Sequence, residues 1–428
     1  MNSAYYIFAL RGWSTFAGGS LLILIPMFMS PIEQGYYYTF SSLVGMQMLF
    51  DLGFASVIVQ FVAHEFAHLS LDNKFKLSGP DQNLSRLYQL KNILNKWYKY
   101  ISGVFFLAAG LVGVVFFGLN DPDNVSIWLA PWIVLVFFAS VNLYFNSKVA
   151  IFEGLGQLYR VTRVKLAISI LAYATLWVIL ILGGGIWISV VVPIVGSIGL
   201  MFWIYRNEIL KDRTIVSQSD IGINWLRDVA PLQWRIALSS ASGYLIFSLF
   251  TPIIFANQGP EEAGKIGVTL TIFTTLHLLG SSWISAKVPI FPALIARNDF
   301  ISLNKVFKKS LVQSLLYTAL LCSVAIFVIY FIGIYDIFPS RRLAGIDVAI
   351  LLAIVAVCNT AIYSLAVYMR AFKKEPMLVN SLIMAALVPS FVYIFSKISV
   401  MYAISTYAAL TLFISLPWTV TLFIKNKK

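Results

Sequence analysis

The chain has 428 residues, of which 59% are apolar and 11% are charged. Soluble domains carry about 25% charged residues, so this composition excludes a soluble enzyme and predicts a membrane protein. The 31 lysines and arginines exceed the 18 aspartates and glutamates, which gives a net charge of +13. In a membrane protein such an excess reflects loop charges, and nucleic acid is not an expected partner. Cys322 and Cys358 lie inside apolar runs, which excludes a disulfide framework or a zinc cluster.

Twelve apolar stretches are long enough for membrane-spanning helices of about 20 residues. In chain order they are 4–29, 36–63, 99–119, 127–147, 164–182, 186–205, 231–256, 264–286, 310–335, 346–369, 377–396 and 400–424. The first stretch continues past Pro26 to Met29, which is longer than the core of a signal peptide, and we expect it to be a permanent span. The sequence therefore predicts an all-α polytopic membrane protein with about twelve transmembrane helices.

The basic residues between these spans are distributed unevenly. The segments after the even-numbered spans, together with the C-terminal tail, hold 25 lysines and arginines. The opposite side holds Lys265, Arg341, Arg342 and Lys397. By the positive-inside rule, both termini and the long loops are expected in the cytoplasm. The outward loops are short, which argues against an outward catalytic domain.

The two halves of the chain repeat a short pattern. The corresponding positions are Arg11 and Arg235, Gly19 and Gly243, Pro26 and Pro252, and Glu33-Gln34-Gly35 and Glu262-Ala263-Gly264. Six spans per half is an even number, so both halves enter the membrane from the same side. We expect two six-helix bundles, residues 1–210 and 211–428, related by a parallel repeat around a central cavity. This architecture favours transport by alternating access.

A basic amphipathic stretch precedes the third span of each half. The apolar residues of these stretches are Leu84, Leu87, Leu94 and Trp97 in the first half, and Phe300, Leu303 and Phe307 in the second. The pattern is typical of helices that lie on the cytoplasmic membrane surface, and we expect a structural role for them.

Several stretches resemble those of bacterial O-antigen flippases of the Wzx type and related polysaccharide transporters. They are 31–40 (PIEQGYYYTF), 51–53 (DLG), 59–65 (VQFVAHE), 282–287 (SWISAK) and 368–376 (YMRAFKKEP). These families belong to the multidrug/oligosaccharidyl-lipid/polysaccharide exporter superfamily. The resemblance implies a flippase that moves an undecaprenyl-pyrophosphate-linked oligosaccharide across the bacterial inner membrane for surface polysaccharide biosynthesis. It also implies membrane lipids, a polysaccharide polymerase and chain-length proteins as partners.

The segment 64–68 (HEFAH) has the H-E-x-x-H pattern, which on a helix can present two zinc ligands and a general base. A zinc site needs a third protein ligand. The next glutamate is Glu153, two spans later, and the remaining histidine is His277 in the eighth span. We therefore interpret His64 and His68 as interfacial side chains, and expect no metal, no cofactor and no enzymatic activity.

Asp51 lies well inside the second span, where a carboxylate should face protein or water. Two interpretations are open. Asp51 is an ion-coupling or gating group, or it is a structural partner of Arg11 or of helix dipoles.

Four basic residues lie near the cytoplasmic ends of spans: Arg11, Arg235, Lys148 and Lys287. Each could extend its charge to the interface, or line the inward mouth of a cavity and bind a pyrophosphate. The correspondence of Arg11 with Arg235 favours the cavity. Trp283 lies beside Lys287 and either belongs to the interfacial aromatic belt or stacks on a sugar.

Two other functions compete with the flippase. A cation-coupled multidrug or metabolite exporter of the same superfamily would share the layout and could use Asp51 as its ion site, but would be expected to carry several intramembrane acids. A polysaccharide polymerase or ligase would need a large outward loop with catalytic residues, which the short outward loops do not provide.

Overall fold

The computed structural model describes residues 2–51, 54–71, 77–207, 230–372 and 375–427. These residues are almost entirely helical, and ten of their helices are long and apolar enough to cross a membrane. The prediction of an all-α polytopic membrane protein is confirmed. The chain divides into two compact units, which are described separately.

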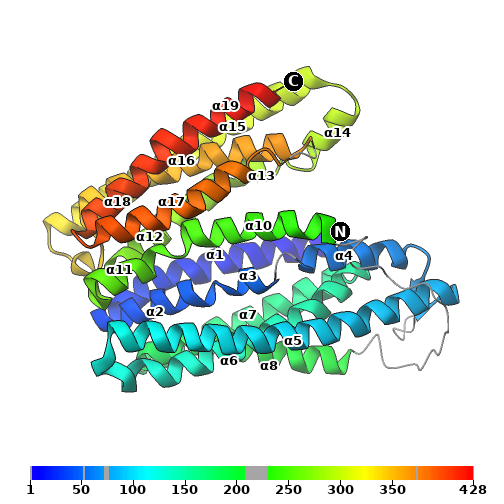
Figure 1. Ribbon diagram of the computed structural model, residues 1–428, viewed down its shortest axis with the longest axis horizontal. Helices are drawn as coiled ribbons and strands as arrows, with labels where there is room; N and C mark the ends of the chain where they lie inside the picture. The colour runs from blue at the N-terminus through cyan, green and yellow to red at the C-terminus, as the bar shows by residue number, and fades with distance from the viewer. Residues whose placement is uncertain (1, 52–53, 72–76, 208–229, 373–374, 428) are drawn as a thin grey trace. The chain divides into compact units, whose positions relative to one another are not determined.

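Unit 1 comprises Met1–Met29 and Leu43–Ala241. Its described helices are α1 (Asn2–Phe28), α3 (Gln47–Asp51), α4 (Phe54–Phe66), α5 (Asp81–Asn120), α6 (Val125–Gly154), α7 (Leu158–Ile181) and α8 (Ile188–Arg206). Helices α5 to α8 run side by side, and α1 packs on α7 (Figure 1). Two short strands, β1 (Ser70–Leu71) and β2 (Leu77–Ser78), pair antiparallel in the loop before α5.

Unit 2 comprises Ser30–Ser42 and Ser242–Lys428. Its helices are most of α2 (Pro31–Val44), the second part of α10 (Ala230–Phe247), α11 (Phe250–Gln258), α12 (Pro260–Gly280), α13 (Ser282–Ser285), α14 (Ile290–Ala296), α15 (Phe300–Ile334), α16 (Ile346–Arg370), α17 (Leu378–Ser396), α18 (Val400–Ala409) and α19 (Leu416–Asn426). A π-helical segment, Leu410–Ser415, joins α18 to α19. The expected domain boundary at 210–211 lies outside the described residues.

The second and the seventh of the expected spans are interrupted helices. The second span breaks at Gly45 and Met46, where hydrogen bonds of turn type replace the helical ladder. Glycine disfavours the helix interior by about 1 kcal/mol relative to alanine. The seventh span breaks between α10 and α11, and Pro252 has no N–H to donate to the carbonyl of Ser248.

The amphipathic stretches do not form separate surface helices, so this expectation was wrong. The first is the beginning of α5, which runs without a break for 40 residues, or about 60 Å at 1.5 Å per residue. The second begins α15, an uninterrupted helix of 35 residues. Leu84, Leu87 and Leu94 are buried against protein, whereas Trp97 is 39% exposed. The apolar face was identified correctly, but it packs on other helices instead of on lipid.

Helices α5 and α6 of unit 1 are closely packed against each other. Gly113 lies against the indole of Trp132, and a Cβ atom on Gly113 would overlap that ring. The buried Trp132 donates its Nε1 hydrogen to the carbonyl of Gly110 at 3.4 Å. Small residues such as glycine let the two helices approach closely. Close packing matters in a membrane, because lipid tails are apolar and provide no hydrophobic driving force for helix association.

In unit 2, the beginning of α12 crosses α2 backbone against backbone. A Cβ atom on Gly35 would overlap the carbonyl of Pro260, and a Cβ atom on Gly264 would lie 2.9 Å from the backbone nitrogen of Gly35. Gly35 and Gly264 are corresponding positions of the internal repeat. The repeat therefore places its two glycines at one close helix crossing.

Candidate functional site

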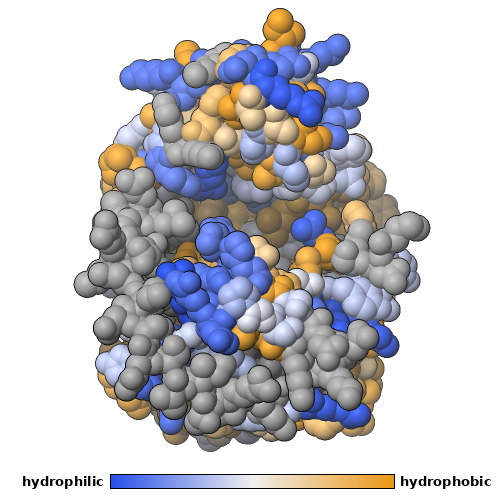
Figure 2. All heavy atoms as spheres, turned by 90° about the vertical axis from the view of Figure 1, so that its right-hand side faces the viewer, coloured by the Kyte–Doolittle hydropathy of each residue, from blue (hydrophilic) through white to orange (hydrophobic). Residues whose placement is uncertain are grey.

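Within each unit taken by itself, hydrophilic residues gather at one end, which in unit 1 holds the beginning of α5 and in unit 2 holds α14 (Figure 2). The lysines and arginines of the loops predict that these ends face the cytoplasm. The predicted substrate-binding residues belong to both units, and each is described within its own unit.

Lys148 of α6 lies in an aromatic setting in unit 1. Its Nζ is 4.8 Å from the ring centroid of Tyr144, which is one turn earlier, and 5.6 Å from that of Tyr205 on α8. The ring of Phe145 is 5.8 Å away. Contacts of this kind are worth about 0.5–2 kcal/mol each and leave the positive charge in place. No carboxylate of the described residues pairs with Lys148, so its charge can be offered to an anion.

The structure describes the side chain of Arg11 but not that of Arg235, the corresponding arginine of the repeat. Arg11 is exposed on α1 and forms no ion pair with a described residue. Arg235 belongs to α10, but its side chain lies outside the described part of the chain. The predicted role of both arginines at a cavity stays a prediction. Trp13, next to Arg11, donates to Ser169 Oγ at 3.1 Å and so links α1 to α7.

Trp283 and Lys287 lie together in unit 2, one turn apart. Trp283 is on the short helix α13, is 45% exposed and packs edge-on against Tyr317. Lys287 is partly buried in the turn that leads to α14. An exposed indole beside an ammonium group suits a ligand that has both sugar faces and negative charge.

Asp51 ends the short helix α3 of unit 1 and is partly buried. Its Oδ1 accepts a hydrogen bond from the hydroxyl of Tyr98 on α5 at 3.0 Å. The partner expected from the sequence was Arg11 or a helix dipole, and Tyr98 was not expected. The signal for Tyr98 was available, because it lies four residues after Leu94 on the buried face of α5.

The glutamate of the H-E-x-x-H segment is buried against other parts of the protein. The side chain of Glu65 is 4% exposed, accepts a hydrogen bond from Asn83 Nδ2 at 2.9 Å, and pairs with Arg86 at 3.6 Å. The side chain of His64 is 79% exposed. Among the described residues, no group of three or more side chains could hold a metal ion. Glu65 therefore joins α4 to the beginning of α5.

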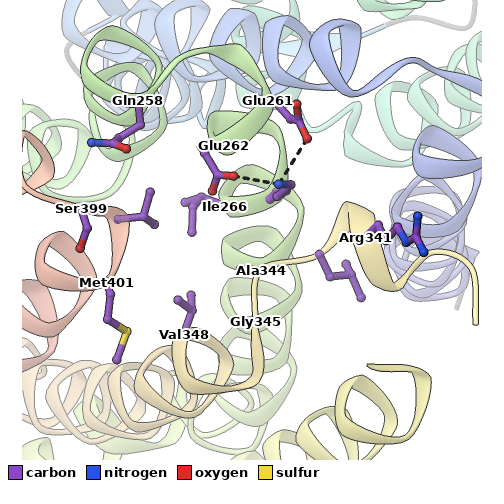
Figure 3. A pocket seen from close by; sticks show the side chains of 13 residues that line it. Gln258, Glu261, Glu262, Ile266, Arg341, Ala344, Gly345, Val348, Ser399 and Met401 are labelled. Atoms are coloured by element: carbon purple, nitrogen blue, oxygen red, sulfur yellow. Dashed lines mark hydrogen bonds and ion pairs between the residues drawn. The ribbon is translucent and has the colours of Figure 1, made fainter. Parts of the chain in front are cut away.

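Unit 2 contains a polar pocket of about 720 Å³ that sequence reasoning did not identify (Figure 3). Lys265 lies between Glu261 and Glu262, with Nζ–O distances of 3.3 and 2.8 Å. Arg341 lies on the neighbouring loop at the edge of the pocket, and its side chain points away from the other labelled residues (Figure 3). The spacing of three and four residues between these acids and Lys265 was a signal for paired charges. Such a pocket offers both charges to a polar ligand.

The loop beside this pocket carries a further ion pair. The guanidinium of Arg341 hydrogen bonds to Asp336 and holds the pKa of that carboxyl below its usual range. The hydroxyl of Ser340 donates a second hydrogen bond to Asp336 at 3.0 Å. The aspartate therefore stays ionised at neutral pH and neutralises part of the basic charge of the loop.

Solved structures with the same fold are transporters. The structure described as Lipid II flippase MurJ in an inward closed conformation has a TM-score of 0.61 and 13% identity, and covers 99% of this chain and 89% of its own. An outward-facing MATE family multidrug resistance transporter of the MOP superfamily has a TM-score of 0.54 and 13% identity, covering 100% and 95%. No protein-family model and no curated protein matches the sequence. At this level of identity the likeness establishes the fold.

Proposed function

We propose that the chain is a flippase that moves an undecaprenyl-pyrophosphate-linked oligosaccharide, an O-antigen or similar repeat unit, from the cytoplasmic to the outer leaflet of the bacterial inner membrane. The observation that carries this proposal is a fold shared along 99% of the chain with a structure described as a lipid II flippase. The sequence stretches that resemble O-antigen flippases point the same way. Both termini are cytoplasmic in this proposal, as the charge distribution predicts.

The cargo explains why the protein needs polar surfaces inside a membrane. A glycan of several sugars cannot cross about 30 Å of hydrocarbon unaided, since its hydroxyls would lose water without gaining partners. A pyrophosphate adds about two negative charges. Transport therefore requires groups that bind anions and groups that stack on sugars, while the polyprenyl tail stays in lipid.

Lys148, Arg11 and Lys287 are the anion-binding groups of this proposal, together with Arg235. Lys148 is the best supported, because Tyr144 and Tyr205 surround its ammonium group. Trp283 supplies an exposed sugar-stacking surface beside Lys287. Asp51 is proposed as a gating or ion-coupling group, with its carboxylate held by Tyr98.

The test is transport by the purified full chain in vesicles. The cargo is an undecaprenyl-pyrophosphate oligosaccharide with a fluorophore on its glycan, and a membrane-impermeant reductant bleaches the outer leaflet. The protein should raise the bleached fraction above the share that starts outside. Lys148→Gln should lower the initial rate by about tenfold, which corresponds to about 1.4 kcal/mol. Lys148→Arg should retain part of the rate, because it keeps the charge.

The control is Lys96→Gln, which removes one positive charge from an exposed position of α5. It should flip cargo at the wild-type rate. Equal rates for Lys148→Gln and Lys96→Gln would remove Lys148 from the mechanism. Failure of the wild type to move any lipid-linked glycan would refute the flippase.

A cation-coupled multidrug or metabolite exporter is the second candidate, supported by the fold shared with a MATE family transporter. The same vesicles distinguish the two functions. An exporter would accumulate a fluorescent organic cation when an ion gradient is imposed, and Asp51→Asn would abolish this uptake. A flippase would leave the dye distribution unchanged.

The proposed cargo also defines the proposed partners. A flipped repeat unit is delivered in the outer leaflet, where a polysaccharide polymerase and chain-length proteins would use it. Membrane lipids surround the exposed apolar residues of the helices.

A further inference from the structure

His277 lies near the end of α12, among the membrane-spanning helices of unit 2. Its Nδ1 is 2.9 Å from Thr360 Oγ1 on α16 and 3.4 Å from Ser281 Oγ. Thr360 Oγ1 is in turn 3.2 Å from Thr318 Oγ1 on α15. Thr360 and Thr318 are fully buried. One imidazole nitrogen thus belongs to a hydroxyl network that joins three helices.

The acceptors around the hydroxyl groups of the network favour one of the two tautomers of the neutral ring. The hydroxyl of Thr360 donates to the carbonyl of Ala356 at 2.9 Å, and that of Thr318 donates to the carbonyl of Ser314 at 2.8 Å. A threonine hydroxyl has one hydrogen to donate, so Thr360 Oγ1 is left to accept from His277. Nδ1 then carries the hydrogen, and Nε2 keeps its lone pair.

A pocket of about 230 Å³ opens beside this ring. His277 lines it together with Thr274, Asn359 and Tyr407, and the remaining wall is aliphatic and phenylalanine side chains. Among the described residues that line it, His277 alone has an acidic or basic side chain. A pocket of this volume can hold several water molecules, each of which occupies about 30 Å³ in the liquid. The polar groups of the wall give such water hydrogen-bond partners.

The helices around His277 bring few titratable groups to it. Tyr363 of α16 stands edge-on to the imidazole, with 6.3 Å between ring centroids, and Tyr407 of α18 lies in the pocket wall. Helix α15 contributes Thr318, with the buried Cys322 one turn further along. The sequences of α11 and α13 contain no titratable residue. The other charged residues of these elements lie at helix ends and in one turn. They are Glu33 of α2; Glu261, Glu262 and Lys265 at the beginning of α12; Arg341 and Arg342 in the turn at 340–342; Lys305, Lys308 and Lys309 near the beginning of α15; and Asp347 and Arg370 at the two ends of α16.

We propose that His277 is a proton-binding site, that the proton is taken up at Nε2 from water in the pocket, and that this uptake changes how α12 packs against α15 and α16. Protonation turns Nε2 from an acceptor into a charged donor. Since the described lining of the pocket contains no carboxylate, the imidazolium needs water in addition to the side-chain oxygen of Asn359, so the pocket must hydrate when the proton binds.

Two features make α12 sensitive to such a change. Gly280, three residues after His277, lies against Thr318 so closely that a Cβ atom would overlap the hydroxyl. The other end of the same helix crosses α2 at Gly35 and Gly264. A shift of α12 at His277 is therefore transmitted along one helix to the crossing. Proton uptake thus regulates the flippase, and this step rests on the proposed function.

The proton site is tested without transport. The chain has three histidines, so ¹⁵N-histidine-labelled full-length protein in lipid nanodiscs gives few signals, and His277→Gln assigns the one of interest. The neutral ring should show the Nδ1-protonated tautomer and should bind a proton reversibly as the pH is lowered from about 8 to about 3. Thr360→Val should lose the tautomer preference. An Nε2-protonated neutral ring, or no titration in this range, would overturn the proposal.

The regulatory step is tested by measuring flipping against pH for His277→Gln and for His68→Gln, the same change at an exposed position. The His277 variant should lose the pH dependence of the initial rate that the wild type and the His68 variant show. Identical pH profiles for all three would overturn the regulation. If no protein moves cargo at any pH, the proposed function fails, while the NMR titration still decides the proton site.

Discussion

Replacing Arg86 tests whether Glu65 serves structure or chemistry. The side chain of Glu65 is 4% exposed, and its Oε1 lies 3.6 Å from Arg86 Nη1. The attraction at that distance is about 5 kcal/mol if the effective dielectric constant is about 20. The side chain of Arg86 is 35% exposed, so water screens the interaction. We therefore expect a coupling free energy of about 1–2 kcal/mol, between that of surface pairs and that of buried pairs.

The assay is a double-mutant cycle with Arg86→Gln and Glu65→Gln, which measures reversible unfolding in mixed detergent micelles. The destabilisations of the two single variants should add up to more than that of the double variant. The reason is that Arg86→Gln alone leaves a buried charge without its partner. Lys96→Gln is the control, since it removes a positive charge from the same helix at an exposed position. A coupling free energy within error of zero, with Arg86→Gln no worse than Lys96→Gln, would refute this reasoning.

Three further predictions concern other positions. Asp299 accepts a hydrogen bond from the backbone N–H of Ser302 at the beginning of α15, and this bond lowers the pKa of Asp299. The stabilisation by Asp299 is therefore present above the pKa of the unfolded chain and is lost as the pH falls through the lower pKa of the folded protein. Asp299→Ala should lower the unfolding midpoint at neutral pH, and the difference from the wild type should shrink on acidification. Gly267→Ala should destabilise the folded protein by about 1–3 kcal/mol, because the new Cβ would lie 2.5 Å from the Cβ of Tyr38. Gly243→Ala is the control, since the space around Gly243 is open, and an equal destabilisation by both variants would contradict the packing argument. His64→Ala should leave the flipping rate unchanged and the purified protein without stoichiometric zinc, as checked by metal analysis.

Much of the secondary structure followed from local composition. Hydrocarbon offers no hydrogen-bond partner to the backbone, so each long apolar stretch had to become a helix. Proline and glycine signals were also present in the sequence, but their effects depended on the surroundings. Pro26 lies inside the unbroken α1, whereas the helix is interrupted shortly before Pro252. The location of the breaks could not be predicted, because neighbouring helices decide which lost hydrogen bond is tolerated.

The candidate site divides in the same way. The sequence predicted Lys148 and Asp51 as candidate residues from their charge and their place in or near the spans, since a charge inside a membrane segment is costly wherever the chain folds, and it predicted Trp283 from its place beside Lys287. Tertiary structure alone supplied their partners: Tyr205 reaches Lys148 from a helix 57 positions further along the chain, and Tyr98 reaches Asp51 from 47 positions away. Hydropathy and charge are properties of single residues and short windows, whereas a hydrogen bond or ring contact requires two segments to meet. That meeting depends on the packing of whole helices, and no local pattern encodes it.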